Sequence, residues 1–357
     1  MFLHEYLLSS DNVKKCVERN AAMFRLLDGK TILISGGSGL IGSYFIVMVG
    51  YYNCRYQGNV HVINVDIKET PAFLTLPFFD FVDNVVEKVE NLSLSFFENK
   101  KIDFIIHAAS HTSPYDYAND PVGTMLGNFF GTKILLDLAE SQPNSRFLFC
   151  SSVEAYGAAN SEDTVFVENY SGYVNANTTR SAYPSAKRAS ESLCAAYRAQ
   201  HGVDYCIARI GRIIGPTVDT NDTKAPTQFI LNAAKEEDVV LKSDGMQFYS
   251  YGYVADCVTA ILYILTKGVS GEAYNVASEH GDYHLREIAE MCSRNSQGNV
   301  CSNISKSLDS QGYSKITRAV LDMSKLKKMG WQSVIDIPDG IKETVSVVRM
   351  RLEGKLQ

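Results

Sequence analysis

Tyr183 and Lys187 stand four positions apart in the segment SAYPSAKRASE, residues 181–191. On a helix, side chains with this spacing lie one turn apart on the same face. A phenol with a pKa of about 10 is a poor base at neutral pH, but a neighbouring ammonium group favours its phenolate form. The pair could therefore remove a proton from a hydroxyl group. Because the chain contains 20 tyrosines, about one Tyr-x-x-x-Lys is expected by chance, and the rest of the sequence must decide.

A glycine-rich segment, TILISGGSGLIGSYF at 31–45, predicts a dinucleotide-binding turn between a strand and a helix. Glycines allow the tight turn and let N–H groups at the helix start approach a pyrophosphate. The next predicted strand, VHVINVD, ends at Asp66, whose carboxylate would bind an adenosine ribose and repel a 2′-phosphate. We therefore expect NAD, although the nearby Lys68 leaves NADP open. The predicted cofactor-binding residues are Gly36, Gly39, Leu40, Ile41, Gly42, Asp66 and Lys187.

The elements that must position these residues follow from the hydrophobic pattern. Nearly continuous apolar runs at 31–35, 60–66, 102–109 and 146–152 alternate with helical patterns that begin near residue 40 and cover 131–140. All-apolar strands are typical of a parallel sheet that is covered on both faces. The alternation predicts an α/β protein with a doubly wound, Rossmann-like parallel sheet and a smaller C-terminal substrate-binding region.

The pattern also suggests how the chain is divided. Residues 1–29 read as an N-terminal helical extension, because their apolar positions recur at helical spacing. Residues 30–214 form the expected NAD-binding Rossmann domain. After residue 215 the regular alternation weakens, so residues 215–357 are expected to be mainly the substrate-binding region, interleaved with the Rossmann domain through strands such as EAYNVA at 272–277.

Composition excludes several classes of function. The net charge of −6 offers no basic surface for nucleic acid or for an anionic membrane, and no apolar run is long enough to span a bilayer. The eight cysteines are scattered without a Cys-x-x-Cys pair, which indicates buried free thiols in the cytoplasm rather than a metal site or a disulfide framework. The N-terminus does not read as a signal peptide. We expect a cytoplasmic protein with a small-molecule substrate and no metal.

Five motifs occur together in one order: the glycine turn, HAAS at 107–110, SSVEAYG at 151–157, the Tyr183/Lys187 pair and ARIGRIIGP at 208–216. Over residues 31–345 the chain resembles the extended short-chain dehydrogenase/reductases that modify nucleotide sugars, the NAD-dependent epimerase/dehydratase family. The resemblance implies that Tyr183 takes the O4 proton of the sugar while hydride leaves C4 for NAD. Ser152 would position the sugar oxygen, and Lys187 would also bind the cofactor ribose. A homodimer formed through a helix bundle is implied as well.

Within this family, the turn after the serine separates the subfamilies. The 4,6-dehydratases carry Asp-Glu, whereas this chain has Val153-Glu154 and lacks the general acid. A Glu without the Asp resembles the UDP-glucuronate decarboxylases, as do the segments at 119–140 and 171–193, the latter including Arg180. Oxidation at C4 would turn the C6 carboxylate into a β-keto acid, which loses CO2 readily. The expected catalytic residues are Ser152, Glu154, Tyr183 and Lys187.

Two positions depart from the family's pattern. Arg212 replaces an Asn that helps to hold the substrate, and Tyr249 replaces an Arg that meets the diphosphate or lies near the reacting sugar. Arg212 could restore the lost charge from another strand, so the expected substrate-binding residues are Arg180, Arg212 and Tyr249. The main alternatives are a nucleotide-sugar 4,6-dehydratase or 4-epimerase. A net NAD-dependent dehydrogenase or reductase, and a non-catalytic NAD-sensing protein, belong to other classes.

Overall fold

A computed structural model describes every residue except 69–78, 111, 113, 304–315 and 357. Its largest element is a seven-stranded sheet in the order β11-β7-β5-β4-β1-β2-β3, in which all neighbours are parallel. This doubly wound, Rossmann-type order confirms the expected fold class. The strands are β1 (Thr31–Ser35), β2 (His61–Asp66), β3 (Val82–Val86), β4 (Phe104–His107), β5 (Arg146–Ser152), β7 (Asp204–Ile210) and β11 (Ala273–Val276).

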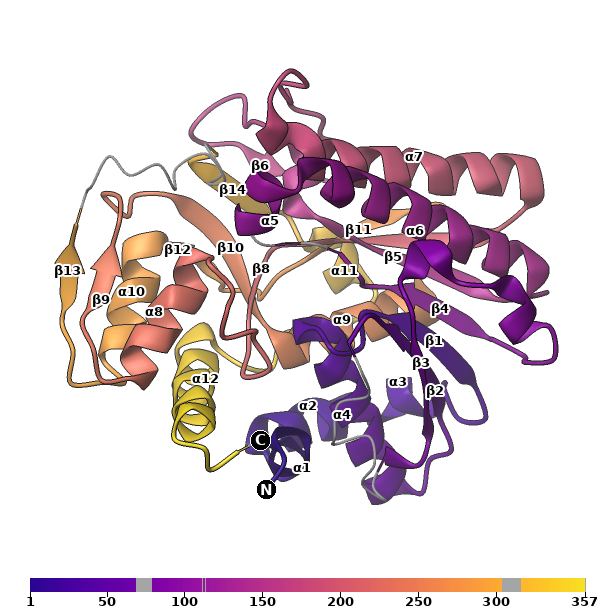
Figure 1. Cartoon of the computed structure of the whole chain (residues 1–357), viewed down its shortest axis with the longest axis horizontal. Coiled ribbons are helices and arrows are strands. Elements are labelled where there is room, and N and C mark those ends of the chain that lie inside the picture. Colours follow the sequence, from indigo (N-terminus) through magenta and orange to yellow (C-terminus); the bar gives the residue numbers. More distant parts are fainter. Residues whose placement is uncertain (69–78, 111, 113, 304–315, 357) are drawn as a thin grey trace.

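Helices cover both faces of this sheet (Figure 1). Helices α4 (Leu40–Tyr56) and α9 (Val254–Lys267) pack on one face, and α6 (Pro121–Ser141) and α7 (Ala182–His201) lie side by side on the other. Ile32 and Ile34 of β1 are buried in the cluster that includes α4 and α9, while Leu33 is buried with α6. Successive side chains of one strand therefore enter two cores, which explains why the strands are apolar throughout.

A smaller region is built around the order β12-β10-β14-β6, with β8 paired to β10, and a second pair of strands, β13 and β9. Residue 215 does not divide the two sheets cleanly, because β11 joins the large sheet and β6 joins the small one. The elements here are β6 (Val165–Phe166), β8 (Arg212–Ile214), α8 (Ala225–Ala234), β9 (Val239–Leu241), β10 (Phe248–Tyr253), β12 (Asp282–His284), α10 (Leu285–Ser293), β13 (Val300–Ser302), β14 (Arg318–Leu321) and α12 (Ile337–Leu352).

The N-terminal segment forms three short helices, α1 (Leu3–Leu8), α2 (Asp11–Arg19) and α3 (Ala21–Arg25), which pack against α4 and α9. One carboxylate ties this segment to the rest of the chain. Glu343 of α12 accepts hydrogen bonds from the side chains of Ser10, Asn12 and Tyr253. The segment therefore contacts both the large-sheet region and the last helix of the smaller region.

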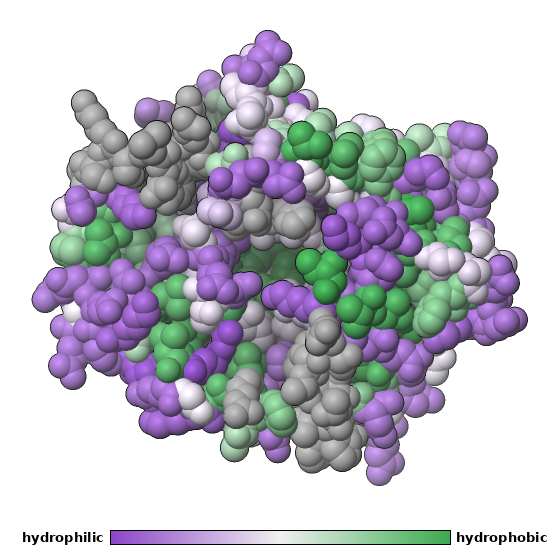
Figure 2. Space-filling model, in the orientation of Figure 1, coloured by the Kyte–Doolittle hydropathy of each residue, from purple (hydrophilic) through white to green (hydrophobic). Residues whose placement is uncertain are grey.

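The remaining elements are short connections: α5 (Pro114–Asn119), α11 (Ser324–Lys328), η3 (Val89–Asn91), η4 (Leu94–Phe97), η5 (Val153–Tyr156) and η6 (Thr179–Ser181). Strand β3 is not apparent in the sequence pattern, because it is an edge strand whose polar and apolar residues are only partly buried. Within the described part of the chain, no helix combines the length and the apolar character needed to cross a membrane. Figure 2 shows a hollow near the centre of one face, between the regions built around the two sheets.

Candidate active site

The glycine turn lies between β1 and α4, as its sequence predicts. Gly36 has φ +78°, a backbone conformation that L side chains rarely adopt. A Cβ atom at Gly42 would lie 2.3 Å from the Gly36 carbonyl oxygen, so only glycine allows the helix to approach the turn this closely. Gly39 is the N-cap of α4 and no side chain caps this helix, so the first-turn N–H groups, including those of Leu40 and Ile41, are available to bind an anion.

Asp66 ends β2 next to this turn and is buried. Its carboxylate accepts hydrogen bonds from the backbone N–H groups of Ser38, at 2.9 Å, and Lys68, at 3.0 Å. The Lys68 ammonium group lies 3.5 Å from a carboxylate oxygen of Asp219, so the cation that could have favoured NADP already has an anionic neighbour. The glycine turn, the uncapped helix and the carboxylate together fit an NAD molecule.

Tyr183 and Lys187 lie in the first turns of α7, and both are buried. Burial raises the pKa of Tyr183 well above its usual value, the Glu154 charge raises it further, and a hydrogen bond with Ser152 lowers it. Ser152 ends β5, so the strand end brings this hydroxyl to the tyrosine. These three residues, Tyr183, Ser152 and Glu154, therefore form one cluster, as the motifs predict.

Lys187 does not contact the phenol as directly as the helical spacing suggests. Its Nζ atom donates a hydrogen bond of 2.9 Å to the Cys150 carbonyl and lies 5.7 Å from the centre of the Tyr183 ring. Burial lowers the pKa of Lys187 to about 8. The lysine is thus held by strand β5, at a distance from which its charge can still act on the tyrosine.

Glu154 and Arg180 form a close ion pair. One terminal nitrogen of Arg180 lies 2.7 Å from each carboxylate oxygen of Glu154. Glu154 lies in η5 and Arg180 in η6, directly before α7, and both side chains are largely buried. The sequence suggested a catalytic role for the first and a substrate-binding role for the second, but not that they bind each other. Their opposite charges compensate each other within this cluster.

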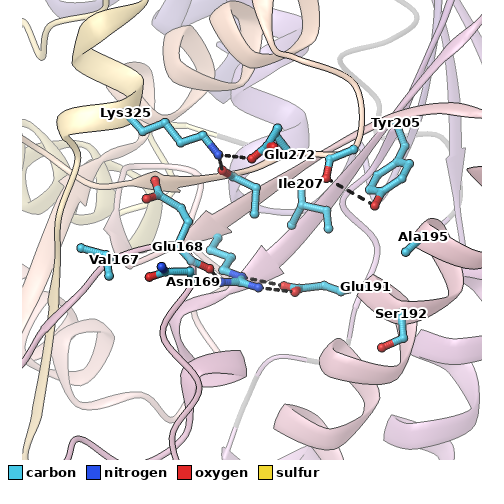
Figure 3. Close-up of a pocket in the computed structure, with 13 residues that line it drawn as sticks. Val167, Glu168, Asn169, Glu191, Ser192, Ala195, Tyr205, Ile207, Glu272 and Lys325 are labelled. Atoms are coloured by element: carbon cyan, nitrogen blue, oxygen red, sulfur yellow. Dashed lines mark hydrogen bonds and ion pairs between the residues drawn. The ribbon is translucent and has the colours of Figure 1, made fainter.

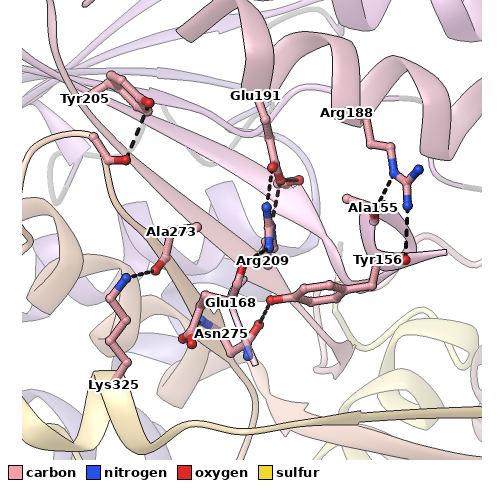
Figure 4. A network of polar contacts seen from close by, with 12 residues as sticks. Ala155, Tyr156, Glu168, Arg188, Glu191, Tyr205, Arg209, Ala273, Asn275 and Lys325 are labelled. Atoms are coloured by element: carbon pink, nitrogen blue, oxygen red, sulfur yellow. Dashed lines mark hydrogen bonds and ion pairs between the residues drawn. The ribbon is translucent and has the colours of Figure 1, made fainter. Parts of the chain in front are cut away.

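A network of polar contacts holds the turn that follows Ser152, residues 153–157, which we call the serine turn (Figure 4). Arg188 donates hydrogen bonds to the carbonyl groups of Ala155 and Tyr156 (Figure 4). It also donates one to the carbonyl group of Gly172. Tyr156 donates a 2.6 Å hydrogen bond to Asn275 of β11. The sequence offered Arg188 only as part of a motif, and its role as an anchor for the turn depends on contacts between distant segments.

The network continues to an ion pair between Glu191 of α7 and Arg209 of β7, with nitrogen–oxygen distances of 3.0 and 2.6 Å. These two residues help to line an open pocket of ≈ 620 Å³ beside the edge strand β11, to which Lys325 of α11 also contributes (Figure 3). Tyr183, Ser152 and the glycine turn do not line this pocket. It is therefore separate from the cluster around Tyr183.

Comparison with known proteins identifies the family. The model of the NAD-dependent epimerase/dehydratase family matches residues 32–277, which include the glycine turn, Ser152, Tyr183 and Lys187. The chain belongs to this family. This confirms the resemblance found in the sequence, and NAD is the cofactor of these enzymes. The residues after 277 complete the smaller sheet and its helices.

Individual relatives agree with this assignment. The chain is 28% identical over 340 residues to UDP-glucuronic acid decarboxylase 1 from Xenopus tropicalis, covering 91% of this chain and 74% of the relative. An epimerase from Methanothermobacter thermautotrophicus has the same fold, with a TM-score of 0.80, 19% identity, and coverage of 94% of this chain and 97% of the other. UDP-glucuronic acid 4-epimerase from Bacillus cereus, solved with UDP-glucuronic acid and NAD, gives a TM-score of 0.75, 21% identity and coverage of 90% and 99%.

Proposed function

We propose that this enzyme decarboxylates UDP-glucuronate through a 4-keto intermediate and returns the hydride to C4. The observation that carries the proposal is the cluster of Tyr183, Ser152 and Glu154, in which the residue next to Glu154 is the buried, apolar Val153. No carboxylic acid stands there to protonate a departing 6-hydroxyl group. The names of the curated relatives support the same reaction, since the first of them are UDP-glucuronic acid decarboxylases.

Each residue of the cluster has a separate task in this proposal. Tyr183 takes the proton of the O4 hydroxyl, and Ser152 holds the same oxygen through its own hydroxyl group. NAD, when bound, takes up the hydride of C4 and later gives it back. The glycine turn, the α4 N-terminus, Asp66 and Lys187 would hold it. Once C4 is a ketone, the C6 carboxylate is a β-keto acid, so CO2 leaves readily and C5 is then protonated.

Lys187 prepares Tyr183 for this task. Burial of the phenol opposes its ionisation, so the tyrosine needs a stabilising charge nearby to act as a base at neutral pH. The Lys187 ammonium group is fixed by the Cys150 carbonyl and lies over the ring of Phe149, with Nζ 4.7 Å from the ring centre. A charge held in this way needs no rearrangement when the phenolate forms.

The alternatives make different demands on the same cluster. A 4,6-dehydratase would need an acid for the 6-hydroxyl group, and the apolar Val153 occupies the position where that family branch carries one. A 4-epimerase would need no group acting at C5 or C6. The Glu154–Arg180 pair would then have only a structural role, whereas in a decarboxylase Glu154 would help to order the groups around C5.

The test is to incubate the purified enzyme with NAD and UDP-glucuronate and to identify the product by mass spectrometry and NMR. We expect loss of CO2 without accumulation of NADH, and no product from Tyr183→Phe. Loss of water would indicate a dehydratase, and an unchanged mass with new sugar couplings would indicate an epimerase. Stoichiometric NADH would instead indicate a net dehydrogenase, and binding of NAD without any product from a panel of nucleotide sugars would contradict an enzymatic role.

We further infer that the protein is a cytoplasmic homodimer. Helix α6 exposes four apolar side chains at helical spacing, Val122, Met125, Leu126 and Phe130, beside α7. A second copy would cover this stripe. All eight cysteines are free, which fits a reducing compartment. Light scattering of wild type and Leu126→Glu tests the dimer, since the charge should favour the monomer if this face is the interface.

The division of the chain is also a proposal. We assign residues 30–214 mainly to cofactor binding and residues 215–357 mainly to substrate binding. Residues 1–29 would form a helical extension that contacts both regions. The contacts of Glu343 with the side chains of Ser10 and Asn12 support the last assignment.

A further inference from the structure

Arg212 and Tyr249 form a stacked pair in the smaller region. The guanidinium carbon of Arg212 lies 3.7 Å from the centre of the Tyr249 ring, which is close for a cation–π contact. Strands β8 and β10 pair in register, with Arg212 opposite Tyr251, two positions from Tyr249 on the same strand face. The Tyr249 hydroxyl donates a 2.5 Å hydrogen bond to the Ile316 carbonyl, so the ring that carries the guanidinium group is itself fixed.

Among the described residues no carboxylate lies within ion-pair distance of Arg212, and its guanidinium group donates no hydrogen bond to a carbonyl group. Glu154 is near enough to act on it electrostatically, but both oxygens of Glu154 are engaged by Arg180. Two arginines therefore face one carboxylate, and among the described residues Arg212 is left without a carboxylate partner of its own.

A second observation points to the same place. Tyr251 is fully buried, and in the described part of the structure its hydroxyl group has no hydrogen-bond partner. The Arg212 charge acts on this hydroxyl group as well. A buried hydroxyl group without a hydrogen-bond partner lowers the stability of the fold. Tyr251 is paired across the strands with Arg212, whose guanidinium group lies on the Tyr249 ring. Such an arrangement is typical of a site that is completed by an anionic ligand.

We propose that Arg212, supported by Tyr249, binds the C6 carboxylate of the substrate and makes the enzyme selective for hexuronates over neutral hexoses. This deepens the proposed function and rests on it. The C6 carboxylate is favoured over the diphosphate because Arg212 interacts with Glu154, which belongs to the cluster around the catalytic Tyr183. Holding the C6 carboxylate would fix the C5–C6 bond relative to the C4 ketone.

Binding without turnover tests this proposal. In a Tyr183→Phe background with NAD present, calorimetry would give the Kd values of UDP-glucuronate, UDP-glucose and UDP for Arg212 and for Arg212→Gln. The parent should bind UDP-glucuronate more tightly than UDP-glucose. Arg212→Gln should raise the Kd of UDP-glucuronate on the order of tenfold or more, while the Kd values of UDP-glucose and UDP should change by less than about twofold. Arg212→Lys keeps the charge and should retain part of the preference.

Arg318→Gln is the matched control. Arg318 lies over Phe248, at 5.0 Å from the ring centre, and Phe248 is next to Tyr249 and therefore on the opposite face of β10. This substitution should leave all three Kd values unchanged. Equal weakening of all three ligands by Arg212→Gln would assign the cation to the diphosphate and overturn the proposal.

Two further results would also overturn it: unchanged affinities in Arg212→Gln with an unchanged circular dichroism spectrum, or equal affinity of the parent for UDP-glucuronate and UDP-glucose. The proposed decarboxylation fails in a different way, when the enzyme with Tyr183 intact binds UDP-glucuronate and releases no CO2. A selective binding site with another reaction would then remain. The two ideas can therefore fail separately.

Discussion

Replacing Lys187 by methionine should remove a pH-dependent loss of stability that is greatest at neutral pH, and should abolish the activity. The Lys187 side chain is buried, and burial lowers its pKa from the ordinary value of 10.5 to about 8. The difference corresponds to about 3 kcal/mol of free energy of unfolding, because each pKa unit corresponds to about 1.4 kcal/mol. Methionine has a similar length and removes the charge.

The sign of the pH dependence follows from the proton balance. Between about pH 8 and 10.5 the unfolded state binds more protons at this lysine than the folded state, so the free energy of unfolding of the wild type rises with pH. Below pH 8 the lysine is charged in both states, and the whole penalty is present. The stability of Lys187→Met relative to the wild type should therefore be highest near pH 7 and fall by about 3 kcal/mol by pH 10.5.

Urea unfolding followed by circular dichroism, at several pH values between 7 and 10.5, measures this difference. Titrating groups that the Lys187 charge does not influence contribute equally to both proteins and cancel. The methionine cannot donate to the Cys150 carbonyl, which costs about 1–3 kcal/mol at every pH. That cost shifts the whole difference curve without changing its slope. A difference that stays constant from pH 7 to 10.5 would refute the reasoning, whatever its absolute value.

Three other substitutions address the cofactor turn and the serine turn. Gly42→Ala should destabilise the protein by about 1–3 kcal/mol and weaken NAD binding, because the new Cβ would meet the Gly36 carbonyl; urea unfolding and fluorescence titration with unchanged midpoint and affinity would contradict this. Asp66→Asn should narrow the preference for NAD over NADP on the order of tenfold, since the charge that repels a 2′-phosphate is lost; equal weakening of both cofactors would argue against a ribose contact. Arg188→Lys should lower kcat on the order of tenfold, because one ammonium nitrogen cannot replace both Nε and Nη2, from which the guanidinium group reaches the three carbonyl groups. Arg198→Lys, at an exposed position on the same helix, is its control, and equal effects of the two substitutions would speak against an anchoring role.

Much of the fold could be read from the sequence because its signals are local. An apolar run predicts a strand such as β1 from its own residues, and the glycine turn follows from steric limits within seven positions. Helical spacing likewise placed Tyr183 and Lys187 on one face of α7. Strand β3 was missed because an edge strand with mixed polarity has no such local signal.

The tertiary structure alone decided which charged groups meet. Lys187 bonds to a carbonyl of β5, Arg180 pairs with Glu154 across 26 positions, and Arg212 lies on the Tyr249 ring because β8 and β10 are neighbours. The family resemblance predicted that these residues are catalytic or bind the substrate. Which side chains contact one another, however, depends on strand order and register. Strand order and register are set by the packing of the whole chain, so only the tertiary structure shows that no described carboxylate pairs with Arg212.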